Sequence, residues 1–168
     1  MAATYLKFDK HSVRNSKLVS KDSTVKYTIN TVTGRPGKWK PTVVHASGGL
    51  AGSIDWPGGM FTIGGVERSI EGVAGPSTGL VKRTGGEFKK EWAWSETRYT
   101  VRYLDGEDQW TVRPTLGFTE VARLEAWDKT PPTILMSSEL QDETERMFLL
   151  LVFIYCKKLG SGKLGSGE

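Results

Sequence analysis

One segment near the C-terminal end restricts the fold more than any other. Ten consecutive residues, from Met147 to Cys156, carry no charge and no strongly polar group. A helix that spans a bilayer needs about 20 apolar residues, whereas a run of about 10 to 14 is more typical of a buried core helix. We therefore predict a core helix here. A buried strand stays open as an alternative, because Leu151 to Tyr155 is rich in strand-forming residues, and so does a membrane anchor.

The residues on either side of the apolar run are those that begin and end helices. Acidic residues stand before it and two lysines stand after it, an arrangement that suits the helix dipole. Ser138 and Gln141 have the spacing of a capping box, and Gly160 lies where a C-terminal glycine cap is expected. These signals together predict one helix over residues 138–159.

The rest of the chain has the pattern of short strands. Apolar residues at Val25, Tyr27 and Ile29 alternate with polar ones, and Gly64-Gly65 is a signal for a two-residue hairpin. About a dozen such segments precede the helix. A helix that is apolar all round must be enclosed on every side, and in a chain without another long helix only sheet can enclose it. We predict a mainly β fold, an antiparallel closed barrel of about twelve strands around the C-terminal helix.

Length and composition indicate one globular domain. The chain has 168 residues, of which 25% are charged and 38% are hydrophobic. We assign residues 1–159 to this domain and residues 160–168 to a flexible Gly/Ser-rich tail. The single cysteine, Cys156, excludes an internal disulfide, and the N-terminal residues lack the apolar core of a signal peptide. We therefore expect a cytoplasmic protein, either free or peripheral at a membrane.

Five stretches carry a family resemblance. They are YLKFD (Tyr5–Asp9), GSIDW (Gly52–Trp56), EWAW (Glu91–Trp94), VARLE (Val121–Glu125), and the acidic start, apolar run and basic end of Leu140–Leu159. In these stretches the chain resembles an uncharacterised fungal family of the tubby C-terminal and phospholipid-scramblase-like superfamily. The resemblance implies a barrel of about twelve strands around a hydrophobic helix, and relatives in the wider superfamily bind phosphoinositides or act at membranes. It brings no catalytic motif.

The residues themselves also give little support to an enzyme. The two histidines, His11 and His45, have neither metal-ligand spacing nor a neighbouring cysteine. The chain lacks a nucleophile elbow, a phosphate-binding loop and a dinucleotide fingerprint. Cys156 lies in the apolar run, where a thiol is inert. We predict no catalytic residues, no metal site and no cofactor.

Basic residues are the strongest functional signal. Arg98 and Arg102 are four positions apart in a predicted strand, so their side chains share one face. The predicted anion-binding group consists of Lys82, Arg83, Lys89, Lys90, Arg98, Arg102 and Arg113. Arginine forks and lysine ammonium groups both recognise phosphates. The alternative is that these charges only decorate a solvated surface.

A second basic segment surrounds a tryptophan. Trp39 stands between Lys38 and Lys40 in a stretch rich in turn residues, so we predict an exposed surface contact there. The other tryptophans are expected to pack in the core. Exposed ones would instead suit carbohydrate stacking.

We therefore expect a non-catalytic binding module for anionic phospholipid or phosphoinositide head groups at a membrane surface. The alternatives are a protein-interaction or structural domain without a lipid ligand, and a carbohydrate-binding protein that uses exposed tryptophan. We expect no nucleic-acid partner, because the chain has no recognised nucleic-acid-binding module.

Overall fold

The computed structural model describes residues 3–33, 39–78, 87–104, 109–126 and 130–159. They form thirteen strands and two helices. The strands are β1 (Ala3–Phe8), β2 (Ser16–Ser20), β3 (Val25–Thr33), β4 (Trp39–Ala46), β5 (Ala51–Asp55), β6 (Met60–Ile63), β7 (Val66–Ser69), β8 (Ala74–Thr78), β9 (Glu87–Ala93), β10 (Arg98–Leu104), β11 (Gln109–Pro114), β12 (Ala122–Glu125) and β13 (Thr133–Ser137). The helices are α1 (Ile70–Val73) and α2 (Glu143–Leu159). The fold is mainly β, as predicted, with one long helix at its C-terminal end.

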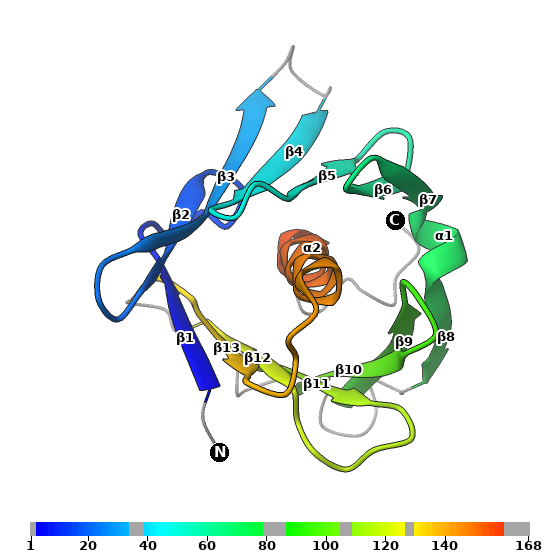
Figure 1. Cartoon of the computed structure of the whole chain (residues 1–168). Coiled ribbons are helices and arrows are strands. Elements are labelled where there is room, and N and C mark those ends of the chain that lie inside the picture. The colour runs from blue at the N-terminus through cyan, green and yellow to red at the C-terminus, as the bar shows by residue number, and fades with distance from the viewer. Residues whose placement is uncertain (1–2, 34–38, 79–86, 105–108, 127–129, 160–168) are drawn as a thin grey trace.

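All thirteen strands belong to one antiparallel sheet in the order β7-β6-β5-β4-β3-β2-β1-β13-β12-β11-β10-β9-β8. Viewed along α2, the strands surround this helix, and α1 lies between the edge strands β7 and β8 (Figure 1). In the described part of the chain, no backbone pairing joins β7 to β8. The closed barrel that we predicted is therefore not confirmed, because the ladder of hydrogen bonds is open at this position.

The apolar run occupies the interior of the ring. The eight residues from Met147 to Ile154 are each no more than 1% exposed. Side chains on every side of the helix are thus covered by the inner faces of the strands, which confirms the prediction of a core helix. Among the residues that the structure describes, no helix has the length and apolar character needed to cross a bilayer.

The helix begins later than predicted. The capping side chain is Asp142, whose Oδ1 accepts the backbone N–H groups of Thr144 at 2.8 Å and Glu145 at 3.2 Å. Ser138 instead follows β13 in a turn, in which the Leu140 N–H donates to the Ser137 carbonyl at 3.1 Å. The predicted capping box is therefore wrong, and α2 starts at Glu143.

A glycine hairpin begins β7 and a short helix follows it. Gly64 and Gly65 have φ values of +57° and +84°, so they form the predicted two-residue hairpin between β6 and β7. Strand β7 ends at Ser69. Ser69 Oγ accepts the Gly72 N–H at 2.9 Å and caps the short helix α1.

Aromatic rings fill the space between α2 and the sheet. Tyr155 of α2 stacks on Trp56 with ring centroids 5.7 Å apart, and meets Phe61 and Trp92 edge to face at 5.9 and 5.8 Å. These contacts join the end of α2 to β6, β9 and the turn after β5. The interior around Tyr155 is therefore filled by packed aromatic rings.

Candidate functional site

The outer face of β9 to β12 carries a continuous row of polar side chains. The strand register places Lys89 opposite Arg102, Arg102 opposite Thr111, and Thr111 opposite Arg123. Side chains directly opposite each other in antiparallel strands have Cβ atoms about 5 Å apart. The alternate residues of the same strands face α2 and are buried: Phe88, Val101, Tyr103, Trp110, Val112 and Leu124. The period of two thus separates a cationic outer face from an apolar inner one.

A pocket of about 500 Å³ lies over this row. Its lining includes four cationic side chains, Lys89, Arg102, Arg113 and Arg123, and one carboxylate, Glu120. Hydroxyl groups of Thr100 and Thr111 and the ring of Phe118 complete most of the wall. Three predicted residues, Lys89, Arg102 and Arg113, are therefore brought together, although they come from three different strands.

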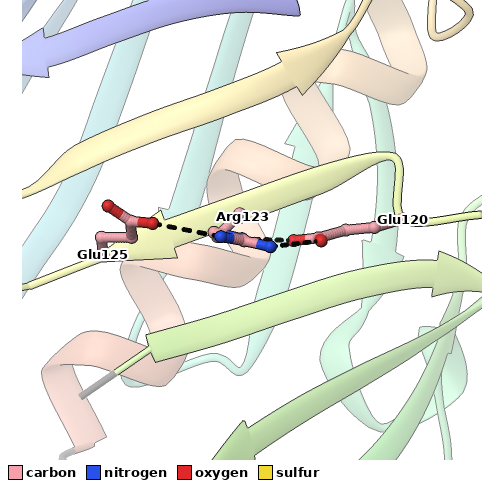
Figure 2. Close-up of polar contacts among 3 residues, drawn as sticks. All are labelled: Glu120, Arg123 and Glu125. Atoms are coloured by element: carbon pink, nitrogen blue, oxygen red, sulfur yellow. Dashed lines mark hydrogen bonds and ion pairs between the residues drawn. The ribbon is translucent and has the colours of Figure 1, made fainter. Parts of the chain in front are cut away.

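Arg123 neutralises the carboxylate of this pocket. Its Nε and Nη2 atoms donate to the two oxygens of Glu120 at 2.6 and 2.7 Å, and Nη1 lies 3.3 Å from Glu125 Oε1 (Figure 2). The hydrogen bonds that Arg123 donates to Glu120 are the main cause of a raised pKa for the Arg123 guanidinium. Since this pair is bidentate, Glu120 is engaged by Arg123, and Lys89, Arg102 and Arg113 supply the remaining positive charge.

The three remaining cations differ in their surroundings. Lys89 and Arg102 are half-buried and have interaction partners within the chain. Arg113 is exposed, and none of the described acidic groups forms an ion pair with it. Thr100 lies opposite Arg113, and its hydroxyl is 3.0 Å from that of Thr115. Guanidinium, ammonium and hydroxyl groups around one hollow form a donor set suited to a phosphate or another oxyanion.

Two other predicted residues lie apart from this pocket. Arg98 is exposed on the outer face but does not line the pocket, and its Nη1 is 3.8 Å from Glu91 Oε2. Lys90 is on the inner face, with Nζ 5.4 Å from the centroid of the Trp92 ring. Neighbouring residues of a strand point in opposite directions, so Lys90 cannot join Lys89 in one cluster. Lys82 and Arg83 lie outside the described residues.

The second predicted contact lies elsewhere on the molecule. Lys40 is exposed near the start of β4, while Lys38 and the Trp39 side chain lie outside what the structure describes. The ends of β3 and β4 project from the ring on the side of α2 opposite to β10 and β11 (Figure 1). Lys40 therefore cannot contribute to the pocket on β9 to β12.

The tryptophans that the structure describes serve packing. Trp92, Trp94 and Trp110 are at most 5% exposed. Trp56 is half-buried, and its Nε1 donates to Thr42 Oγ1 at 2.9 Å. Trp92, Trp94 and Trp110 thus present no exposed face to a sugar, and one face of the Trp56 ring is covered by Tyr155. The side chains of Trp39 and Trp127 lie outside the described set.

The groups with catalytic potential are also dispersed. His11 and His45 are both exposed and lie on different segments, the first between β1 and β2 and the second in β4. Burial raises the pKa of the Cys156 thiol to about 12, which keeps it protonated. Within the described ranges, no three His, Cys, Asp or Glu side chains form a group that could hold a metal ion.

Three pocket residues, Arg123, Glu120 and Phe118, were not predicted from the sequence to belong to a binding site. Alternation along residues 120–127 puts Arg123 on the face opposite to Ala122 and Leu124. Its place beside Thr111 depends on the pairing of β11 with β12, which the local pattern does not contain. Phe118 lies between strands, where no periodicity applies.

Comparisons with known proteins add little to these observations. No family model matches the chain, and no curated protein matches it. A solved structure of a protein from Arabidopsis thaliana is similar over 94% of this chain and 91% of its own, with 9% sequence identity and a TM-score of 0.46.

Proposed function

We propose that the chain is a non-catalytic binding module whose pocket on β9 to β12 receives the anionic head group of a phospholipid, with phosphoinositides as the best candidates. The observation that carries this proposal is the convergence of Lys89, Arg102 and Arg113 around one hollow, while Arg123 holds Glu120, the only carboxylate among the described residues that line it. A phosphorylated head group offers several oxyanions that can each be met by one of these cations.

The dimensions of the pocket agree with such a ligand. Its volume of about 500 Å³ lies in the range of about 300 to 1,000 Å³ that is usual for small-molecule sites. The pocket is built on paired strands, so its cations are held by the sheet and need little reordering when a ligand binds. Its position on the outer face would allow contact with a head group that remains part of a bilayer.

The proposed function includes a fold family. We propose that the chain is a member of the tubby and phospholipid-scramblase-like superfamily, with α1 completing the wall between β7 and β8. The enclosed C-terminal helix and the antiparallel sheet around it support this assignment. Under this proposal the protein is cytoplasmic and binds the membrane peripherally.

Vesicle co-sedimentation tests the proposal. Phosphatidylcholine vesicles with and without a phosphoinositide are mixed with the protein at low ionic strength, where electrostatic contacts are least screened. We expect binding to the phosphoinositide vesicles alone, with the bound fraction falling as salt is added. Equal binding to both vesicle types, or no binding to either, would contradict the proposal.

A pair of matched variants separates the pocket from general surface charge. Arg113→Gln and Arg98→Gln each remove one exposed positive charge from the outer face, but only Arg113 lines the pocket. We expect Arg113→Gln to weaken binding about tenfold, as is typical for the loss of a charge-assisted contact, and Arg98→Gln to change it about twofold or less. Equal losses in both variants would assign the effect to net charge rather than to the pocket.

A further inference from the structure

The segment between β11 and β12 exposes two large apolar side chains. Leu116 is 100% exposed and Phe118 is 96% exposed. Single exposed apolar residues are common on protein surfaces, but two large ones separated by one glycine form a local apolar surface. In Figure 1 the chain after β11 swings outward from the ring of strands before it returns to β12. These side chains therefore point away from the core, where they have no packing role.

Backbone hydrogen bonds hold this segment in place. The Thr115 N–H donates to the Arg98 carbonyl at 2.8 Å, and the Val121 N–H donates to the Val112 carbonyl at 2.8 Å. Between them, the Gly117 N–H donates to the Pro114 carbonyl at 2.9 Å and closes a turn with Leu116 inside it. The turn presents Leu116 at its corner. Leu116 is thus exposed within a hydrogen-bonded turn, and Phe118 is exposed directly after that turn.

The apolar surface adjoins the cationic pocket. Phe118 lines the pocket together with Arg113, and Leu116 stands three positions after Arg113. Positive charge beside exposed leucine and phenylalanine matches the cross-section of an anionic bilayer leaflet, which has charged head groups above acyl chains. A purely aqueous anion would explain the cations but would leave Leu116 and Phe118 without a role.

We propose that the turn of residues 115–119 inserts into the bilayer when the pocket holds an anionic head group, so that Leu116 and Phe118 enter the acyl-chain boundary. This inference rests on the proposed function and adds to it a second, hydrophobic component of binding. The occupant is the anionic lipid surface, because the charge on the adjoining pocket complements it. Insertion would direct one side of the ring, at β11 and β12, toward the membrane.

A fluorophore at position 116 reports insertion directly. Leu116→Cys is labelled with a polarity-sensitive dye, and the buried native thiol of Cys156 is protected from the reagent. We expect a blue shift on phosphoinositide-containing vesicles and quenching by lipids with nitroxide groups on their acyl chains. The control is His11→Cys, an exposed position between β1 and β2, at the opposite end of the strands from residues 115–121.

The outcomes separate this inference from the proposed function. If labelled protein binds the vesicles but its emission stays that of water, the turn does not insert and the inference is wrong, while head-group binding stands. If the protein does not bind at all, both proposals fail. An equal blue shift at positions 116 and 11 would also overturn the inference, because it would indicate adsorption without a defined orientation.

A single variant gives an independent measurement. Leu116→Ser removes an apolar side chain that is fully exposed and lies outside the pocket lining, so the thermal unfolding midpoint is expected to stay that of the natural sequence. We expect vesicle affinity to fall about tenfold, while affinity for a soluble inositol phosphate stays within about twofold, because that ligand has no acyl chains. Unchanged vesicle affinity would overturn the inference, because insertion of the turn would then contribute nothing to binding.

Discussion

Gly52 of β5 lies against Met147 of α2 so closely that a Cβ atom on Gly52 would stand 2.8 Å from both Cγ and Sδ of Met147. Leu151 Cδ1, one helical turn further on, would be 3.4 Å from the same position. The absence of a side chain on Gly52 therefore sets the distance between β5 and the central helix. The glycine of the GSIDW stretch has a packing function that its sequence context alone does not reveal.

This contact predicts that Gly52→Ala destabilises the protein by about 1 to 3 kcal/mol, the usual cost of adding volume to a packed core. Urea unfolding measures the loss. The matched control is Gly48→Ala, because Gly48 is exposed and no atom lies within 4 Å of its Cβ position. We expect the control to change the free energy of unfolding by about 0.5 kcal/mol or less. An equally stable Gly52→Ala variant would mean that Met147 moves aside without cost.

The enclosure of α2 makes a second prediction. Leu150 is fully buried, and Leu150→Asp would place a carboxylate among apolar side chains at a cost of several kcal/mol. Since small domains have a total stability of about 5 to 15 kcal/mol, we expect this variant to be unfolded or aggregated. Circular dichroism and the emission of the buried tryptophans measure the outcome. Leu150→Met, which keeps the volume, should cost less than about 1.5 kcal/mol.

A folded, soluble Leu150→Asp protein would contradict the structure, since it would require solvent to reach the middle of the ring. The expected loss of stability in Leu150→Asp comes from the apolar surroundings of Leu150, because α2 does carry a buried carboxylate at another position. Glu145, two residues before the apolar run, is itself buried, and its Oε1 accepts hydrogen bonds from Ser95 and Tyr99 at 3.1 and 3.0 Å. A carboxylate is tolerated there because hydroxyl donors face it.

The central helix could be predicted from the sequence because its signal is local. An uninterrupted apolar run between charged ends has few structural interpretations, and the burial of Met147 to Ile154 follows from it. The start of the helix could not be fixed in the same way. Ser138 with Gln141 and Asp142 with Glu145 are both plausible capping pairs, and the choice depends on where β13 ends its pairing with β1.

The candidate site shows the same division between local and long-range information. Strand alternation placed Arg98 and Arg102 on one face, whereas Lys89 and Arg113 were identified only as basic members of the predicted anion-binding group. The place of Lys90 could have been predicted, because Phe88, Lys90, Trp92 and Trp94 are spaced by two and share one face of the chain. Since Trp92 and Trp94 are buried, Lys90 lies on the inner face as well. The contribution of Arg123 was not predictable locally, since it comes from the register of β12 on β11.

Alkaline pH should destabilise the protein through Cys156. Burial raises the pKa of its thiol from 9.0 to about 12, so the unfolded chain loses this proton at lower pH than the folded one. The contribution to stability is complete below pH 9.0 and is lost as the pH rises toward 12. Burial also raises the pKa of Tyr27 and Tyr155, which adds a loss of the same sign above pH 10.0.

The contribution of the Cys156 thiol to this loss of stability is measured by comparing the free energies of unfolding of the natural sequence and Cys156→Ala at about pH 8 and about pH 10.5. The alanine variant is expected to be less stable at both values because a buried atom is removed, but its stability should fall less between them. Equal falls in the two proteins would show that the thiol has the same pKa in the folded and unfolded states.

Glu120 provides a test of charge in the pocket. Glu120→Gln removes the carboxylate that Arg123 engages, so the pocket lining gains one net positive charge. The pair is about one-third exposed, and exposed ion pairs contribute about 1 kcal/mol or less to stability, so the variant should remain folded. A positive charge near an anionic surface is worth about 1 kcal/mol, and we therefore expect about fivefold tighter binding to phosphoinositide vesicles at low salt.

The control is Glu91→Gln, which removes an outer-face carboxylate from Arg98 but lies outside the pocket lining. Both variants change the net charge of the protein equally. If the pocket is the binding site, Glu120→Gln should have the larger effect, and the difference should persist with a soluble inositol phosphate. If the two variants tighten vesicle binding equally and neither changes the affinity for the soluble ligand, the attraction belongs to the whole outer face, and Lys89, Arg102 and Arg113 do not form a specific site.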